Sequence, residues 1–408
     1  MAAYAHRYVP YYRETMRRLG LGPDDIRSAA DLGRLPLLER EQLQRDPLYF
    51  VSQAEPLERY MKLQTGGSSG APVTVMRNPV RSGEVGHHER GHAVARKLIG
   101  KRWGARMMEI ASPLSPAATL RRAFRKQIIP ISFLGTKRLE LSLLDPPAEA
   151  LAAMNEFRPD LILSYGSYLE ALFQHAHRSG TDFHRPSVVV YHSDSLPEPT
   201  RRMIQREIGI EVLTFYSAVE APEIGFECEQ HRGFHLNCDL HPVRILAEDG
   251  KELPDGESGE VVVSNLVNRG TVLLNYRLGD VASKLPGGCP CGRSLPMLSF
   301  LEGRVGDWVL AANGERIHPQ AVRVQFTQEA EVWRYQVVQR SPSHFSIALV
   351  TAPDCDRGAL EARLAAKFAA SFGGETTIEV SFVDEIPRTA RGKVRTVIAL
   401  ADSHGVAQ

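Results

Sequence analysis

Three short apolar runs, each ending in small or polar residues, recur in the middle of the chain at 159–167, 187–195 and 210–220. Each run is short and bounded by turn residues, which is typical of a buried strand. The segment 198–209, between the last two runs, has a helical pattern, and so does 82–100, which ends at a glycine. Because buried strands alternate with helices, the pattern predicts a largely parallel sheet that is covered on both faces.

The pattern changes after about residue 240. Segment 241–266 contains two strand-like runs separated by Asp-Gly turns, which is typical of antiparallel hairpins. A smaller unit of strands and one amphipathic helix follows Gly303–Gly306, where two glycines provide a hinge. The sequence therefore predicts an α/β fold. Its large N-terminal domain, 1–303, has parallel-rich sheets covered by helices plus an antiparallel β subdomain, and its small, mobile C-terminal domain, 304–408, is α+β.

Composition narrows the function class. The chain has 408 residues, more than one ordinary core accommodates, and 43% of them are hydrophobic, as in globular proteins. Lys and Arg number 49 against 48 Asp and Glu, so the basic footprint of a nucleic-acid binder is missing. No apolar run approaches the roughly 20 residues that cross a bilayer, and the first twenty residues lack the apolar core of a secretion signal. We therefore expect a cytoplasmic protein with neither a nucleic-acid nor a membrane partner.

Polar side chains follow the three predicted buried strands. Ligands of parallel sheets bind beyond the carboxyl ends of the strands, so these residues are candidates for a substrate pocket. They are Tyr165, Gly166, Tyr168, His192, Ser193 and Asp194, with Tyr216 and Ser217 after the third run.

A Gly/Ser-rich stretch precedes the strand-like run 73–77. It consists of Thr65, Gly66, Gly67, Ser68, Ser69 and Gly70. Glycine backbone amides and hydroxyl groups can converge on a phosphate, although the Gly-Lys-Ser/Thr ending of a Walker loop is absent. Taken alone, the stretch favours a plain turn between two strands.

Three charged residues stand in positions suited to nucleotide chemistry. Glu220 follows a strand and can hold Mg²⁺ through its carboxylate, with substrate phosphates completing the coordination. Asp280 follows a glycine and can accept hydrogen bonds from ribose hydroxyls. Lys393 follows a glycine in a basic segment and can stabilise a developing anion. Each of them, alone, is equally compatible with a solvated turn or tail.

The order of these motifs along the chain is more specific than any one of them. A Gly/Ser loop, Tyr-Ser-x-x-Glu at 216–220, Tyr-Arg-x-Gly-Asp at 276–280, Gly-Arg at 303–304 and Pro-Arg-Thr-x-x-Gly-Lys at 387–393 follow one another. This set resembles the adenylate-forming superfamily of acyl-CoA synthetases, peptide-synthetase adenylation domains and luciferase. Two further stretches, 9–41 and the Cys-Pro-Cys-Gly segment that begins at Cys289, resemble phenylacetate–CoA ligase-like and CapK-like proteins.

The resemblance implies an enzyme that uses ATP and Mg²⁺ to activate an acid as its adenylate. It implies a phosphate-binding role for Thr65 to Gly70. Tyr216, with Ser217, would lie at the adenine and the acyl group, and Glu220 near Mg²⁺. Asp280 and Arg304 would bind the ribose, and Lys393 would bridge the carboxylate and the α-phosphate.

Two positions depart from the family pattern. Val73 replaces the lysine usual after Pro72, and Gly306 stands where Asp or Lys usually marks the hinge of domain rotation.

The five cysteines are too few and too clustered for a disulfide framework in a long chain. Cys228 and His231 in one segment, with Cys289 and Cys291 in another, form a Cys₃His set suited to tetrahedral Zn²⁺. Four protein ligands leave no open position, so we expect a structural zinc ion. His235 and Cys238 are alternative ligands, and buried free thiols are the alternative to a metal. The resemblance to CapK-like proteins also implies such a metal.

The acid and its acceptor stay open. Aromatic residues among the pocket candidates favour a small, flat aromatic acid, although Tyr and His are also ordinary wall residues. The acceptor can be CoA or an amine. A third alternative is that the protein activates an oxyacid such as nitrite and passes it to an aryl amine. A non-catalytic nucleotide-binding homologue is the alternative class, and retention of Glu220, Asp280 and Lys393 argues against it. A monomer or a homodimer is expected.

Overall fold

The computed structural model describes most of the chain. It covers residues 1–64, 72–78, 89–101, 104–112, 136–305, 309–311, 316–317, 319–326, 329, 331–386 and 396–400. The α-helices are α1 (Ala2–Tyr8), α2 (Pro10–Arg18), α3 (Arg40–Arg45), α4 (Glu89–Ile99), α6 (Pro147–Phe157), α7 (Gly166–Ser179), α8 (Glu198–Arg202), α9 (Pro319–Val324) and α10 (Arg357–Phe372). Shorter helical turns are Pro23–Asp25, Ala30–Arg34, Pro47–Phe50, Leu57–Arg59 and the π-helical Met203–Ile208. None of the described helices is long and apolar enough to cross a membrane.

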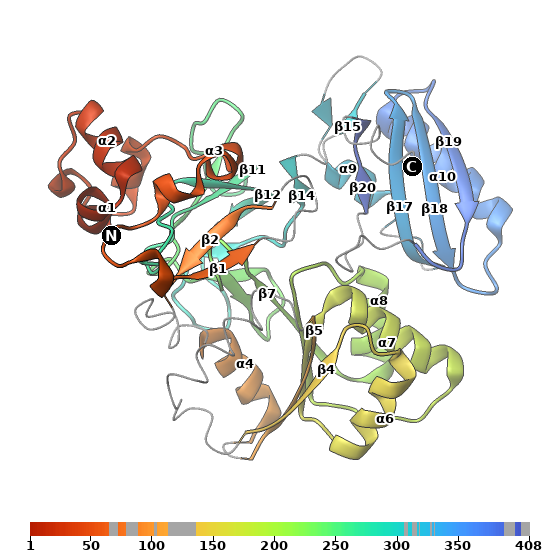
Figure 1. Ribbon diagram of the computed structural model, residues 1–408. Coiled ribbons are helices and arrows are strands. Elements are labelled where there is room, and N and C mark those ends of the chain that lie inside the picture. The colour runs from red at the N-terminus through yellow and green to blue at the C-terminus, as the bar shows by residue number, and fades with distance from the viewer. Residues whose placement is uncertain are drawn as a thin grey trace.

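Most of the strands belong to one large sheet (Figure 1). The first ten are β1 (Met61–Gln64), β2 (Thr74–Arg77), β3 (Arg106–Ala111), β4 (Lys137–Ser142), β5 (Leu161–Tyr165), β6 (Val188–His192), β7 (Glu211–Tyr216), β8 (Gly225–Glu227), β9 (Phe234–Leu236) and β10 (Val243–Leu246). The others are β11 (Ser258–Val263), β12 (Tyr276–Leu285), β13 (Met297–Leu298), β14 (Gly303–Arg304), β15 (Val309–Leu310), β16 (Arg316–Ile317), β17 (Val332–Ser341), β18 (His344–Thr351), β19 (Thr377–Phe382) and β20 (Val397–Ile398).

The large sheet has the order β10-β11-β12-β13-β9-β8-β7-β6-β5-β3-β4, with β14 added to β12. Strands β3 to β7 pair in parallel, and every pairing from β7 through β8 to β10 is antiparallel. The predicted fold class, with a parallel-rich part and an antiparallel part, is confirmed. The two parts form one continuous sheet, in which the antiparallel pairing already begins at β8.

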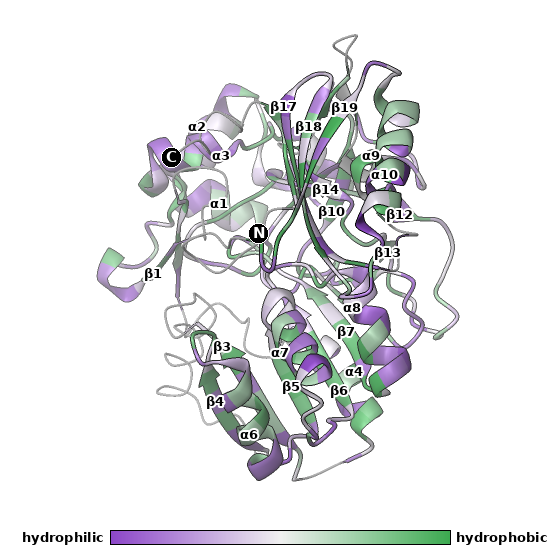
Figure 2. Cartoon of the chain, turned by 90° about the vertical axis from the view of Figure 1, so that its right-hand side faces the viewer, coloured by the Kyte–Doolittle hydropathy of each residue, from purple (hydrophilic) through white to green (hydrophobic). Residues whose placement is uncertain are grey.

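Alternation along the parallel strands places apolar side chains on both faces of the sheet. On β5, Ile162 packs against α6 and α7 on one face, whereas Leu161 and Leu163 pack with Val94 and Ala95 of α4 on the other. The strands β5 to β7 are accordingly green, the hydrophobic end of the scale, in Figure 2. Burying one such side chain contributes about 1.5–3 kcal/mol, so the two cores together hold the sheet between its helices.

The N-terminal helices are fixed to the antiparallel part by polar contacts. The Tyr12 hydroxyl donates to the Val272 carbonyl at 3.2 Å and accepts from the Leu274 amide at 2.7 Å. The Asn275 amide group donates to the carbonyls of Leu32 and Leu35 at 2.5 and 2.9 Å. These bonds hold the start of β12, the strand that carries Asp280.

The C-terminal part has its own sheet, β19-β18-β17-β20, and its own core. Helix α10 is capped by the Asp356 carboxylate, which accepts from the Ala359 amide at 3.1 Å. Its buried residues follow a spacing of four, as the sequence pattern predicts, and are Leu360, Leu364, Phe368 and Phe372. The boundary at 303 and 304 stays a prediction, and β14 at Gly303–Arg304 still pairs with the large sheet.

Candidate active site and cysteine cluster

Three sequence-predicted nucleotide residues meet where β7, β12 and β14 come together. The Tyr216 hydroxyl donates to Asp280 Oδ2 at 2.9 Å, and Arg304 Nε lies 3.3 Å from Asp280 Oδ1. Burial, followed by the Asp280 carboxylate, raises the pKa of Tyr216 well above its usual value. Tyr216 is therefore a neutral donor that fixes one carboxylate oxygen of Asp280. The register of β12 against β14 places Asp280 directly opposite Arg304.

Glu220 lies in the compact turn that follows β7. The turn is closed by the Glu223 amide, which donates to Ser217 Oγ at 3.0 Å, so the Ser217 hydroxyl has a local role. Asn265 Nδ2 donates to the Glu220 carbonyl at 2.9 Å and turns this residue inward. Only 7% of the Glu220 side chain is exposed.

Two residues to which the sequence analysis assigned no role contact the Glu220 carboxylate. The Tyr276 hydroxyl donates to Oε1 at 3.3 Å, and Arg40 Nη1 lies 3.8 Å from the same oxygen. Burial raises the pKa of Glu220, and the Arg40 charge acts in the opposite direction. Arg40 comes from α3, far away in sequence, and carries no local motif that could have identified it.

The candidates for the substrate pocket gather at the ends of β5 and β6. The rings of Tyr165 and His192 lie 5.4 Å apart, and His192 Nδ1 lies 2.6 Å from Ser193 Oγ. Asp194 Oδ1 accepts from the Ser167 amide at 3.3 Å, near the start of α7. Ser193 has φ of 73°, the left-handed conformation, which directs the chain sharply away from β6.

Tyr168 requires a correction, because the prediction placed it at a strand tip. It lies on the buried face of α7, is 3% exposed and belongs to the core between α6 and the sheet. Its hydroxyl donates to the Asp145 carbonyl at 2.8 Å. Tyr168 is therefore a core residue of the α/β part.

Several predicted residues lie outside the described part of the chain. They are Thr65, Gly66, Gly67, Ser68, Ser69, Gly70, Gly306 and Lys393. The strands that precede and follow the Gly/Ser stretch are described, and they pair antiparallel with Gln64 opposite Thr74. The segment after Lys393 is also described from Thr396, and its β20 pairs with β17.

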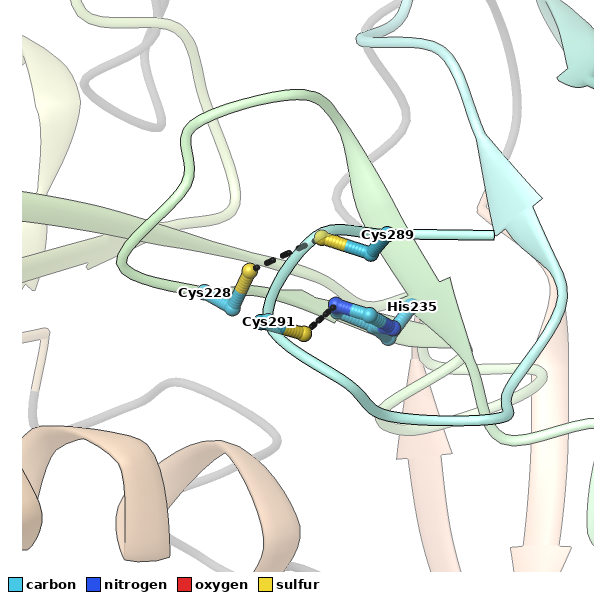
Figure 3. A group of neighbouring side chains, drawn as sticks. All are labelled: Cys228, His235, Cys289 and Cys291. Atoms are coloured by element: carbon cyan, nitrogen blue, oxygen red, sulfur yellow. Dashed lines mark hydrogen bonds between the residues drawn. The ribbon is translucent and has the colours of Figure 1, made fainter. Parts of the chain in front are cut away.

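Four potential metal ligands come together between β8, β9 and the turn before β13 (Figure 3). They are Cys228, His235, Cys289 and Cys291, and their ligand atoms all lie within 4.8 Å of one another. Cys228 Sγ lies 3.7 Å from Cys289 Sγ, and Cys291 Sγ lies 3.4 Å from His235 Nε2. Burial raises the pKa of the Cys228 thiol to about 12, and burial together with Arg293 lowers that of His235.

His231, the histidine first assigned to this set, is not part of it. Its Nδ1 lies 2.8 Å from Glu227 Oε1, and its Nε2 lies 2.6 Å from Glu211 Oε1. Both ring nitrogens therefore face carboxylates instead of thiols. His235, the runner-up, takes its place because it lies in β9 opposite Phe226 of β8, and Cys238 stays outside the group.

Comparison with known proteins finds relatives in sequence and in fold. The family model of the CapK C-terminal domain matches residues 309–399. The phenylacetate-coenzyme A ligase of Thermus thermophilus is 25% identical, with 98% of this chain and 94% of that protein aligned. A crystal structure of 2-hydroxyisobutyryl-CoA ligase in its postadenylation state superposes with a TM-score of 0.78 at 18% identity, over 99% of this chain and 88% of that one. The same ligase in its thioesterification state, with CoA, gives a TM-score of 0.60 at 18% identity, over 97% and 86% of the two chains.

The fold, the ordered motifs and the meeting of Tyr216, Asp280 and Arg304 define an adenylate-forming ligase. Within that superfamily, the chain is similar to the phenylacetate–CoA ligases, and its C-terminal part matches the CapK-type domain.

Proposed function

We propose that the protein uses ATP to activate a small, aromatic carboxylic acid as its acyl-adenylate, with release of pyrophosphate, and passes the acyl group to CoA. The observation that carries this proposal is the convergence of Tyr216, Asp280 and Arg304 from separate segments. Their order and spacing resemble a nucleotide site, and their contacts are those a ribose-binding carboxylate needs: one oxygen fixed by a hydroxyl and the other beside a guanidinium.

The protein's part in such a reaction is to position groups and stabilise charge. Asp280 would accept the ribose hydroxyls, and Arg304, nearly half of whose side chain is exposed, would reach the same sugar. Lys393 would place a positive charge between the attacking carboxylate and the α-phosphate. Bound Mg²⁺ would neutralise phosphate charge, and the buried carboxylate of Glu220 is the described group in this region that would hold it.

The pair of Tyr165 and His192 supports an aromatic acid. Two rings 5.4 Å apart at neighbouring strand ends offer flat surfaces, and His192 and Ser193 add polar atoms beside them. A small aromatic acid would stack on such rings with its carboxylate directed toward the nucleotide.

We also propose that Cys228, His235, Cys289 and Cys291 hold one structural zinc ion. Three thiols and one imidazole within a common 4.8 Å are a typical tetrahedral donor set, and four protein ligands leave no position for a substrate. The ion would join the loop after β8, which follows Glu220, to the turn after β12, which follows Asp280. It would thereby keep both nucleotide segments in register.

The test of the activity is acid-dependent exchange of labelled pyrophosphate into ATP across a panel of aromatic and short aliphatic acids. Phenylacetate is the first acid to try, because the matched relatives are phenylacetate–CoA ligases. Adding CoA, then amines, then an aryl amine with nitrite identifies the acceptor. The absence of exchange with every acid, despite ATP binding, would favour a non-catalytic nucleotide-binding protein.

Lys393→Ala should lower the exchange rate by about 100-fold or more, because it removes a charge that acts in the transition state. ATP binding and the melting temperature should stay unchanged. Lys251→Ala is the matched control, since Lys251 is 83% exposed and pairs with Asp249 in a turn. An unchanged exchange rate in Lys393→Ala would contradict the assigned role.

A further inference from the structure

One buried ion pair joins helix α7 to strand β17 of the C-terminal sheet. Glu170 of α7 pairs with Arg334 of β17, and the two side chains are only 1% and 10% exposed. In Figure 1 the C-terminal sheet lies above α7 and α8, and β17 contacts α8. A pair this well covered differs from most surface ion pairs, because neither charge is solvated while the two parts are in contact.

Glu170 is held in place by its own helix. Gln174, one turn further along α7, donates from Nε2 to Glu170 Oε1 at 3.3 Å, and Arg334 binds the other oxygen, Oε2. The same helix begins at Gly166, beside Tyr165 and the other candidates for the substrate pocket. Glu170 therefore connects the C-terminal part to the helix that borders the proposed acid site.

Arg334 is connected in turn to the segment that carries Lys393. Three residues after Arg334 in β17, Val337 pairs with Val397 of β20. Val397 lies four residues after Lys393 in the chain. A change in the position of β17 therefore displaces the anchor of the Lys393 segment.

We propose that Glu170 and Arg334 are a positioning pair that holds the C-terminal part in the orientation for adenylate formation and separates for acyl transfer. The proposal rests on the function proposed above, and it names a contact that is present during adenylate formation and absent during acyl transfer. The TM-score is 0.78 with the postadenylation state of 2-hydroxyisobutyryl-CoA ligase and 0.60 with its thioesterification state, so this chain superposes better on the first of these two states of one ligase, which supports the proposal.

Because the pair is buried, loss of one partner destabilises only the arrangement in which the two parts are in contact. If one partner is neutralised while the parts stay together, the other charge is left buried without compensation, so the closed arrangement is disfavoured. When the parts separate, water reaches both side chains and the missing partner costs little. Neutralising either residue should therefore lower the population of one arrangement without damaging either fold.

The test separates the two half-reactions in the variants Glu170→Gln and Arg334→Met. Phenylacetate-dependent pyrophosphate exchange should fall by about tenfold or more, in the range usual for coupling between two states. Formation of phenylacetyl-CoA from supplied phenylacetyl-AMP and CoA should be unchanged or faster. The double variant should lose no more exchange activity than the single ones, because the two residues act as one unit.

Arg363→Met is the matched control. Arg363 pairs with Glu329 and Glu331 inside the C-terminal part, so this variant removes an ion pair without touching α7. The ratio of the two half-reactions should stay at the wild-type value. Equal losses in both half-reactions of Glu170→Gln, or losses that multiply in the double variant, would overturn the positioning role.

Small-angle X-ray scattering tests the pair without any substrate. Arg334→Met should have a larger radius of gyration than the wild type and Arg363→Met. Failure of phenylacetate to support exchange in the wild type would count against the proposed acid, whereas this comparison would still test the pair. Identical scattering curves for all three proteins would overturn it.

Discussion

Two histidines four residues apart, His231 and His235, have opposite surroundings. His231 lies between the carboxylates of Glu211 and Glu227, whose hydrogen bonds raise its pKa to about 9. His235 is fully buried beside thiols, and its pKa is lowered by burial and by Arg293. One histidine is therefore a cation that joins carboxylates, and the other is a neutral imidazole suited to bind a metal.

The backbone of the β8–β9 hairpin explains the difference. His231 lies in the turn, with φ of 51°, and its side chain leaves the hairpin toward β7 and α8. His235 lies within β9, between Phe226 of β8 and Met297 of β13, on the side where the cysteines gather. Which histidine can be a ligand depends on the path of the chain, and the distance in sequence from Cys228 does not reveal it.

The carboxylate cluster consists of Glu211 and Glu227 with their partners His231 and Arg201. A substitution in this cluster should give the largest change in stability. Arg201 Nη2 pairs with Glu227 Oε1 at 2.5 Å, and both side chains are buried, at 9% and 0% exposed. Arg201→Met leaves the Glu227 charge without its main partner and should lower the free energy of unfolding by about 3–5 kcal/mol. Urea denaturation measures this change. The zinc content should stay at the wild-type value, and its loss would show that the two clusters are not independent.

A substitution in the cysteine cluster of Cys228, His235, Cys289 and Cys291 should give a smaller change in stability but an all-or-none change in the amount of bound metal. His235→Ala should reduce the bound zinc from about one ion per chain to almost none, because a structural site needs its four ligands. The melting temperature should fall by about 5–10 °C, since loss of a few kcal/mol shifts a domain of this size by about 2–4 °C per kcal/mol. Metal analysis of the purified protein and thermal denaturation measure the two effects.

His231→Ala is the matched control for the metal and should keep its zinc. If His231→Ala loses the metal and His235→Ala keeps it, the assignment of the ligand is wrong.

The smallest effect should appear in the pH dependence of His231→Gln. A pKa raised to about 9 means that the folded protein binds this proton more tightly than the unfolded chain. The stabilisation is therefore complete below the usual pKa near 6.5 and is lost as the pH rises through about 9. The difference in melting temperature between wild type and His231→Gln should shrink steadily from pH 6.5 to pH 9.5. A difference that stays constant over this range would contradict the charged state assigned to His231.

The fold was largely predictable because it depends on local patterns. The apolar runs around Leu161–Tyr165 and Val188–His192 have the signature of buried strands, and Leu360 and Phe368 follow a helical period. Asp280 could be singled out because its motif lies within a few residues along one strand.

The contacts that depend on distant segments were not predictable. Arg40 reaches Glu220 across 180 residues of sequence. Tyr168 was misplaced because α7 begins at Gly166, directly after β5, so that Tyr168 already lies in the helix. The pairing of Glu170 with Arg334 has no motif at either end. Each of these contacts follows from the packing of whole elements, which a single sequence does not encode in a recognisable pattern.

Gly166 limits how the specificity of this protein can be changed. A Cβ atom at this position would lie 2.6 Å from the backbone of Ser195 and Leu196, so helix α7 and the segment after β6 touch directly through their main chains. Any library that varies residue 166 should yield mostly misfolded members, even for a substitution as small as alanine. Directed evolution toward other acids should instead recover substitutions at Tyr165 and His192, the partly buried rings of the proposed acid site.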